Sequence, residues 1–254
     1  MKNLPSAILV IILTISFQCY ADAPYETYFL DRTQIPDNIL RNTKAVLTVN
    51  ITDPKAYAEY YGKSKIMDTP YISIFKKNET SFNKIGILNK ADIKTPTGGE
   101  YGPISWYRFP VIDWQGEFLK IVYNLSEQKK CWVNFSELKS SSIYDQPVLN
   151  QFTNQSSSET VTVDIFYLTK KNEIKLYNAP SLKSASQIVT PASKILTSSG
   201  AYDAGAFQIV EQKNGLARLV HTFGLDMPTQ SIGWIRLRDK NGLLLLWPIL
   251  GYGC

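Results

Sequence analysis

The single histidine and the cysteines are the residues that could carry nucleophilic chemistry. A cysteine thiolate that cleaves peptides needs a histidine base within hydrogen-bond reach, and the chain offers His221 with Cys131 as the candidate nucleophile. His221 ends the segment Leu216–His221, whose pattern favours a strand with the histidine packed in the core. We therefore expect a structural histidine and no enzyme of this class.

Metal and cofactor sites lack their usual residues in this sequence. Catalytic zinc takes three protein ligands, typically including histidine or cysteine, and too few are present. Neither a nucleophile elbow, a phosphate-binding glycine loop nor a dinucleotide fingerprint occurs. Paired carboxylates for glycoside cleavage would be sought among Glu100, Asp113 and Glu117, although surface acids flanking turns are the ordinary explanation. We expect no cofactor and no enzyme activity.

The tryptophans indicate binding. Strand alternation puts Trp234 on one face with Arg236, and Trp132 on one face with Asn134. Rings beside polar side chains on an open face can stack on sugars or pack on peptides. The alternative is that a curved sheet folds this face over, so that the rings only cover the end of a barrel. The candidate ligand-binding residues are Trp132, Trp234, Arg236, Tyr177, Trp106, Tyr107 and Trp114.

The segments around these rings have the composition of short strands. Fifteen Tyr, eleven Phe and five Trp favour β structure. Residues 45–51 are rich in β-branched side chains, and residues 118–123 place Leu119, Ile121 and Tyr123 on one face. One short helix is expected over residues 52–61, which begin with a capping threonine and a proline in the first turn.

Three short segments of the first half have counterparts in the second half, in the same order. The spacing is about one hundred residues, which predicts a divergent tandem duplication. The matched segments are 74–76 with 176–178, 118–123 with 216–221, and 131–134 with 233–236.

The second copy has a recognisable order of strands and turns. Leu176–Ser181 combines an apolar-aromatic strand with a Pro-Ser turn, and Gly233–Leu237 is a closing Gly-Trp-aliphatic strand. Between them lie the strands Phe207–Val210 and Gly215–Val220. Residues 171–248 thereby resemble the bacterial SH3-like (SH3b) domain.

The first copy, residues 69–140, departs from the SH3-like pattern. Lys76–Thr80 replaces the Pro-Ser turn, Cys131 replaces the glycine before Trp132, and the aromatic stretch Tyr101–Trp114 is an insertion. The resemblance implies small, bent antiparallel barrels. Family members commonly act as targeting modules outside the cytoplasm, some on peptidoglycan and others on proteins, and many accompany a hydrolase domain that we do not find here.

The resemblance and the composition together predict a mainly β chain with two SH3-like antiparallel barrels and a short N-terminal β/α extension. The expected divisions are a signal peptide (1–21), the extension with its helix (22–68), a divergent first domain (69–140), a linker (141–170) and a second domain (171–254).

The N-terminus predicts export. Lys2 precedes the apolar run Ala7–Phe17, which is shorter than the roughly 20 residues of a membrane-spanning helix. Cleavage is expected after Ala21, with Ala23 as the alternative and acylation of Cys19 as a weaker one. A periplasmic or secreted protein without a membrane span is expected.

Two cysteines, Cys131 and Cys254, would remain after cleavage, and in an oxidising compartment they predict one disulfide. The alternative is that each is a free thiol, with Cys131 packed in a strand.

The net charge and the distribution of apolar residues limit the classes of binding partner that we expect. The net charge of +5 falls to +4 once Lys2 is removed, and the basic residues form no dense face of the kind that nucleic-acid binding needs. The apolar segment Leu243–Leu250 predicts a closing strand, or a homodimer contact if it were exposed. We expect a noncatalytic module that binds peptidoglycan or a peptide of the cell envelope through aromatic surface. Protein–protein assembly through Leu243–Leu250 or the insertion 101–114 is the alternative.

Overall fold

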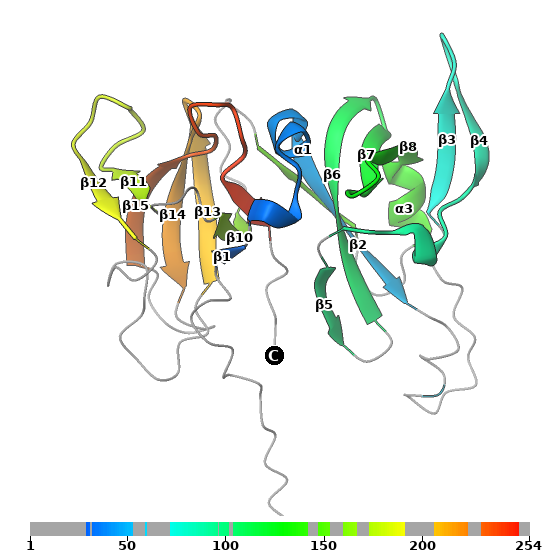
Figure 1. The fold of residues 1–254 in the computed structure, drawn as a ribbon, viewed down its shortest axis with the longest axis horizontal. Coiled ribbons are helices and arrows are strands. Elements are labelled where there is room, and N and C mark those ends of the chain that lie inside the picture. Colours follow the sequence, from blue (N-terminus) through cyan, green and yellow to red (C-terminus); the bar gives the residue numbers. More distant parts are fainter. Residues whose placement is uncertain are drawn as a thin grey trace, which may run out of the picture.

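A computed structural model describes residues 29–30, 32–52, 59, 72–95, 97–101, 104–141, 147–152, 160–166, 173–190, 206–222 and 230–248. These residues form a mainly β structure of two sheets with a few short helices, which confirms the mainly β class expected from the sequence (Figure 1). The closure of each sheet into a barrel stays a prediction. The predicted signal peptide (1–21) lies outside the described residues. The predicted helix (52–61) does so too, apart from Thr52 at a strand end and Glu59, which is helical.

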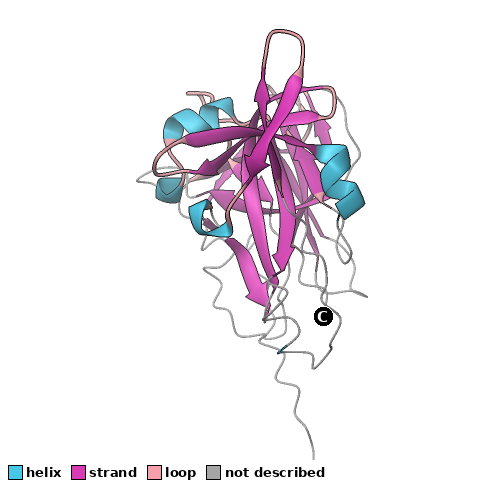
Figure 2. Ribbon diagram, turned by 90° about the vertical axis from the view of Figure 1, so that its right-hand side faces the viewer, coloured by secondary structure: helices cyan, strands magenta, loops and turns pink. Residues whose placement is uncertain are grey.

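The first sheet is built from residues of the first half of the chain. In the described residues its strand order is β4-β3-β8-β7-β6-β2-β9, with β5 paired to β6. The strands are β2 (Ala45–Thr52), β3 (Ser73–Lys77), β4 (Phe82–Ile87), β5 (Thr97–Tyr101), β6 (Ile104–Gln115), β7 (Phe118–Asn124), β8 (Lys129–Asn134) and β9 (Val148–Gln151). The β3–β4 hairpin rises above the rest of the molecule in both ribbon views (Figures 1 and 2).

The second sheet has the order β1-β10-β13-β14-β15-β11-β12, with β16 paired to β10. Its pairs are antiparallel except β1 with β10. The strands are β1 (Phe29–Leu30), β10 (Val161–Phe166), β11 (Ile174–Tyr177), β12 (Ser186–Val189), β13 (Ala206–Lys213), β14 (Leu216–Thr222), β15 (Gln230–Arg236) and β16 (Leu246–Pro248). The helices are α1 (Asp37–Asn42), α3 (Phe135–Ser141) and the 3-10 turns Arg32–Gln34 and Lys90–Asp92.

The two sheets share one topology. Starting from β4, the order β4-β3-β8-β7-β6-β2 corresponds strand by strand to β12-β11-β15-β14-β13-β10. The register agrees as well, because Trp132 pairs with Phe75 and Lys120 where Trp234 pairs with Tyr177 and Arg218. The three sequence matches therefore lie on corresponding strands of the two sheets.

The expected domain boundaries need correction. The predicted linker, residues 141–170, contains β9 and β10, one strand from each sheet. The predicted extension, residues 22–68, contains β2, which lies between β6 and β9 in the first sheet. The insertion 101–114 is mostly β6, the counterpart of β13. These strands are defined by pairing with residues far away in the chain. Polar segments therefore do not mark the domain boundaries.

Apolar side chains form two main cores. One lies within the first half and includes Leu47, Phe109 and Leu119. The other contains residues of the second sheet together with Val122 of the first sheet and Leu40 of α1. The segment Leu243–Trp247 is buried, mostly in this second core, so these residues offer no exposed dimer contact. The predicted closing strand is confirmed for Leu246–Pro248, which form β16 and pair with β10.

Candidate binding surface

Four aromatic rings meet on the first sheet around Trp132. Phe82 of β4 stacks on Phe118 of β7, with ring centroids 3.9 Å apart and planes 6° apart. Phe75 of β3 meets Phe118 edge-on at 5.2 Å, and Phe82 meets Trp132 edge-on at 5.1 Å. We call Phe75, Phe82, Phe118 and Trp132 the ring cluster. Trp132 is only 8% exposed, whereas the three phenylalanines are partly exposed above it.

Strand alternation explains why these rings share a face. Trp132 lies between Phe75 of β3 and Lys120 of β7 as cross-strand neighbours. Side chains two residues apart in a strand point to the same side, so Phe118 joins Lys120, and Lys77 joins Phe75. The opposite face of β7 carries Leu119 and Ile121, which are buried in the first core as the sequence predicts.

Two lysines lie over the central ring of this cluster. The Nζ atoms of Lys77 and Lys120 are 5.9 Å and 5.7 Å from the centroid of Trp132. Such cation–π contacts contribute roughly 0.5–1 kcal/mol each at an exposed site. The ring cluster, Lys77 and Lys120 form the aromatic–lysine surface, which can offer apolar ring area and positive charge side by side.

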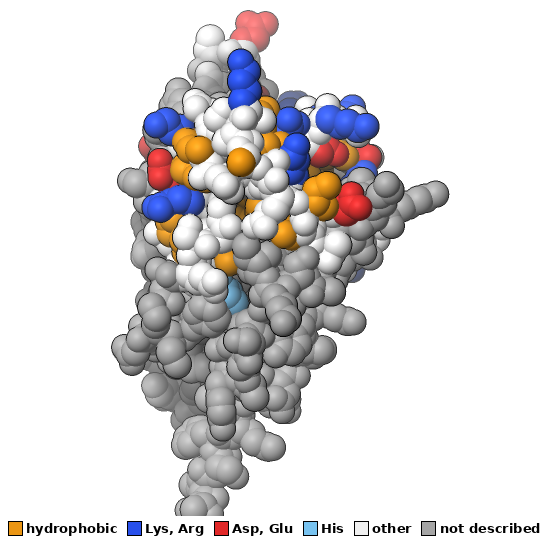
Figure 3. Space-filling model, turned by 90° about the vertical axis from the view of Figure 1, so that its left-hand side faces the viewer, with side chains coloured by type: hydrophobic (Ala, Val, Ile, Leu, Met, Phe, Trp, Pro, Cys, Tyr) orange, Lys and Arg blue, Asp and Glu red, His pale blue; other side chains and the backbone are white. Residues whose placement is uncertain are grey.

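The corresponding place in the second sheet is closed. Tyr177, Leu216 and Trp234 occupy the positions of Phe75, Phe118 and Trp132, but they are only 3%, 1% and 6% exposed and form a small core. The expectation that Trp234 and Tyr177 form an open binding face is therefore wrong. Arg236 is half-buried beside them, and Figure 3 shows separate hydrophobic groups among polar atoms on this side of the molecule.

Local structure accounts for this closure. The β11–β12 connection is a compact turn whose Pro180 carbonyl accepts a hydrogen bond from Asn214 Nδ2 at 3.1 Å. Counting along the paired strands, Ser184 in this turn corresponds to Phe82. The Ser184 hydroxyl donates back to the Ser181 carbonyl at 2.8 Å instead of extending over the rings.

The other aromatic candidates lie elsewhere. Tyr107 of β6 is buried in the first core and stacks near Phe109, which corrects its assignment as a ligand-binding residue. Trp106 is half-buried opposite Asn50 on β2. Trp114 is 43% exposed, with Lys44 Nζ 5.6 Å from its ring centroid. The structure does not bring these three together with the ring cluster.

Sequence reasoning missed Phe75, Phe82 and Phe118 as members of the site. Phe75 and Phe118 were inside the matched segments, where large apolar residues recur in both copies on the face of the tryptophan. The recurrence of large apolar residues on this face indicates that Phe75 and Phe118 lie beside the tryptophan. Phe82 lies outside the matches, so the sequence held no comparable signal for it.

His221 and Cys131, the residues considered for nucleophilic chemistry, lie on strands of different sheets. His221 is buried on β14 and stacks near Phe207 at 5.3 Å, which confirms the expected core histidine. Cys131 lies on β8 of the other sheet, and the structure therefore does not pair it with His221. Burial raises the pKa of the Cys131 thiol to about 12. Cys131 has no disulfide partner among the described residues, and Cys254 lies outside them, so the disulfide stays a prediction.

The carboxylates near β6 are engaged separately. Burial raises the pKa of Asp113, but the hydrogen bond and charge of Lys44, 3.1 Å away, outweigh it together with smaller contributions, and the pKa is lowered. Glu117 accepts a hydrogen bond from Ser136 at 2.6 Å, and the side chain of Glu100 lies outside the description. In the described part of the chain, no three potential metal ligands gather.

Comparisons with protein-family models, with curated proteins and with solved structures found no match. No helix within the described ranges has the length and hydropathy needed to cross a membrane.

Proposed function

We propose that the protein is an exported, noncatalytic module that binds a component of the cell envelope through the aromatic–lysine surface. The observation that carries the proposal is the contrast between the two halves. Equivalent strands carry a closed core of Tyr177, Leu216 and Trp234 in one half and a partly exposed ring cluster in the other.

The ring cluster contains more aromatic side chains than are needed to cover the tryptophan and stabilise the sheet. The second half shows that a tryptophan with two large neighbours can be fully covered at this position. In the first half Phe82 adds a fourth ring by stacking on Phe118, and the three phenylalanines remain partly exposed. Exposed aromatic area next to polar groups is a common feature of binding surfaces.

The SH3-like resemblance and the N-terminal pattern support the envelope as the compartment. The shared topology of the sheets supports a tandem duplication in which each copy includes one of the central strands, β2 or β10. Residues 1–21 supply the signal-like pattern. These features favour a targeting module that acts outside the cytoplasm.

Co-sedimentation with purified peptidoglycan sacculi tests the proposal. We expect the mature protein to sediment with sacculi at low salt, and Phe82→Ser to lose most of this binding because it removes the ring that contacts both Phe118 and Trp132. Leu182→Ser is the matched control, since Leu182 is 48% exposed in the β11–β12 turn of the other half. Wild-type protein that stays in the supernatant, or equal losses in both variants, contradicts the proposal.

The assembly alternative has less support. Of its two surfaces, Leu243–Trp247 is buried, and the described side chains of the insertion are largely core, with Trp114 the clearly exposed one. A stable interface buries much more area than one ring provides. Capture of a protein through Trp114, unaffected by Phe82→Ser, would favour this alternative.

A further inference from the structure

The charge around the ring cluster is unbalanced. Lys77 and Lys120 both lie over Trp132, yet neither makes an ion pair with any described carboxylate. Two ammonium groups near one ring repel each other, and the ring offsets only part of that cost. An anion placed between or beside them would relieve it.

Glu137 and Asp113, two acids of the first half, form their ion pairs with other lysines. Glu137 accepts a hydrogen bond from Ser73 and pairs with Lys84 at 3.4 Å. Asp113 is the cross-strand neighbour of Lys120, whose charge helps to lower the pKa of that carboxyl, but it forms its ion pair with Lys44 at 3.1 Å. Neither acid forms an ion pair with Lys77 or Lys120, so the positive charge of the two lysines is only partly offset within the described residues.

The second half again provides the contrast. Arg218, which corresponds to Lys120, pairs with Glu211 at 3.5 Å. The equivalent of Lys77 is Ala179, two residues beyond the strand position of Tyr177, and carries no charge. Lys175 Nζ lies 5.4 Å from the Tyr177 ring centroid in this half, but that ring is only 3% exposed. Lysines without an ion pair and partly exposed rings therefore occur together only on the first sheet of the described structure.

A ligand that satisfies both features carries a flat apolar face and an anionic group on the same unit. A sugar acid does so, because its ring presents C–H groups on one face and a carboxylate at the edge. A neutral sugar leaves the lysines unpaired, and an acidic peptide segment leaves the phenylalanine rings without a flat partner. Resting on the proposed function, we infer that the aromatic–lysine surface binds an acidic polysaccharide whose sugar rings carry carboxylates.

Three soluble polymers distinguish recognition of sugar rings from recognition of negative charge. Polygalacturonate has a carboxylate on each sugar, its methyl-esterified form keeps the rings without the charge, and poly-L-glutamate has the charge without the rings. We expect titration of the mature protein at low salt to show binding to polygalacturonate that is at least about tenfold tighter than to either other polymer. Added salt should weaken it, because exposed charges are screened.

Substitutions in the aromatic–lysine surface test whether polygalacturonate binds there. Lys77→Gln with Lys120→Gln should weaken polygalacturonate binding about tenfold, as expected for the loss of two exposed ionic contacts, and should flatten its salt dependence. Phe82→Ser should weaken binding to polygalacturonate and leave poly-L-glutamate unchanged. The control, Lys183→Gln with Lys213→Gln, removes the same charge from exposed positions in the other half and should bind as wild type.

Two outcomes overturn the inference. Poly-L-glutamate bound as tightly as polygalacturonate would mean that charge alone is recognised, and esterified polymer bound equally well would mean that the lysines have no ligand. In either case sacculus binding that depends on Phe82 would leave the proposed function standing. Absence of binding to both sacculi and polygalacturonate removes both.

Discussion

The same residue type has different surroundings in the two halves. Trp132 and Trp234 have matching cross-strand partners, but one lies under accessible phenylalanines and the other inside a closed core. Alternation predicts the strand face of each ring correctly. It does not predict exposure, because exposure depends on the neighbouring turn and hairpin.

Cys131 is expected to be unreactive while the protein is folded. Its thiol has a raised pKa of about 12 because of burial, whereas an unfolded cysteine ionises near 8.5. At pH 8.5 the folded protein should react with iodoacetamide at least about 100-fold more slowly at Cys131 than the protein in urea, because the thiolate is the nucleophile. Peptide mapping by mass spectrometry measures both rates.

The sign of the linked stability change follows from the same shift. The fold favours the protonated thiol, so this contribution to stability is lost as the pH rises above about 8.5 toward 12. Equal labelling rates in buffer and urea would contradict burial of the thiol. Labelling in urea only after reduction would instead reveal the predicted disulfide with Cys254.

Gly233 illustrates what the sequence could reveal. Its φ of +133° favours glycine, and an added Cβ would lie 3.2 Å from the Tyr177 carbonyl oxygen. The register shifts next to it, between Leu219 and Val220, which is the bulge that the Gly-Trp pattern marks. The first half shows no shift at the corresponding pair, Ile121 with Cys131, so a side chain is tolerated there.

At the scale of elements, one arginine connects the C-terminal loop to α1. Arg238 donates hydrogen bonds to the carbonyls of Leu40 at 3.1 Å and Arg41 at 3.2 Å, and also to that of Thr43. These carbonyls lie at the C-terminal end of the short helix, where no N–H group of a following helical turn is available to them. Arg238 is therefore the C-terminal cap of α1, supplied from a segment almost two hundred residues away.

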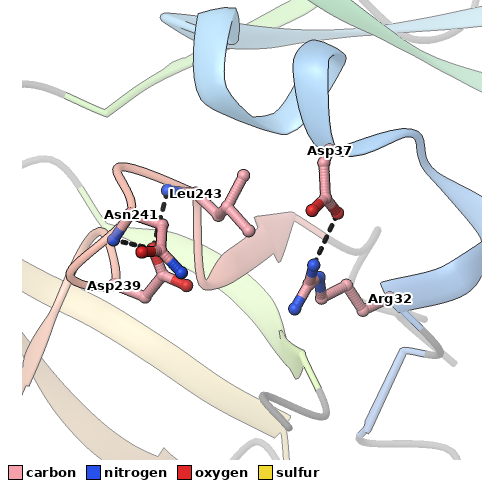
Figure 4. Close-up of polar contacts among 5 residues, drawn as sticks. All are labelled: Arg32, Asp37, Asp239, Asn241 and Leu243. Carbon is pink, nitrogen blue, oxygen red and sulfur yellow. Dashed lines mark hydrogen bonds and ion pairs between the residues drawn. The ribbon is translucent and has the colours of Figure 1, made fainter.

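The loop that carries Arg238 is itself fixed next to α1. Asp239 Oδ1 accepts hydrogen bonds from the backbone N–H groups of Asn241 at 2.7 Å and Leu243 at 2.9 Å (Figure 4). The same view shows Arg32 paired with Asp37 at the start of the helix, 2.5 Å apart. The helix is thus tied at both ends, once locally and once across the molecule.

Arg238→Ala should lower the free energy of unfolding by about 3 kcal/mol, since several carbonyls lose charged donors at once. Urea denaturation followed by circular dichroism measures the change. Arg32→Ala is the control, because its exposed ion pair should contribute less than about 1 kcal/mol. A loss for Arg238→Ala as small as the one expected for Arg32→Ala would contradict a stabilising role of Arg238 at the end of α1.

Local patterns predicted many strands but not how they assemble. The segments 45–51 and 118–123 are strands, and the matched segments lie at equivalent places in the two sheets. The serine and asparagine runs of residues 141–170 predict a linker. Two strands within it pair with residues far away in the chain, and composition alone does not report such pairing.

At the scale of the whole molecule, the two halves share a core. The second core combines Ile39 and Leu40 of α1 and Val122 of the first sheet with Trp247 of the second sheet. Gln212 Nε2 on β13 also donates to the carbonyl of Gln151 on β9, at 2.9 Å. Each sheet is a topological unit, but neither buries its apolar surface alone.

This shared core predicts that the halves unfold together. Leu40→Ala removes a fully buried side chain between the halves, and Leu119→Ala removes a buried one inside the first half. Each should cost about 2–5 kcal/mol and shift one common transition, because loss of either half exposes the second core. Urea unfolding followed by tryptophan fluorescence and by circular dichroism should give coincident curves. Two separate transitions, with Leu119→Ala moving only one, would show that the halves are independent domains. In that case the closed cluster around Trp234 could not depend on the first sheet for its stability.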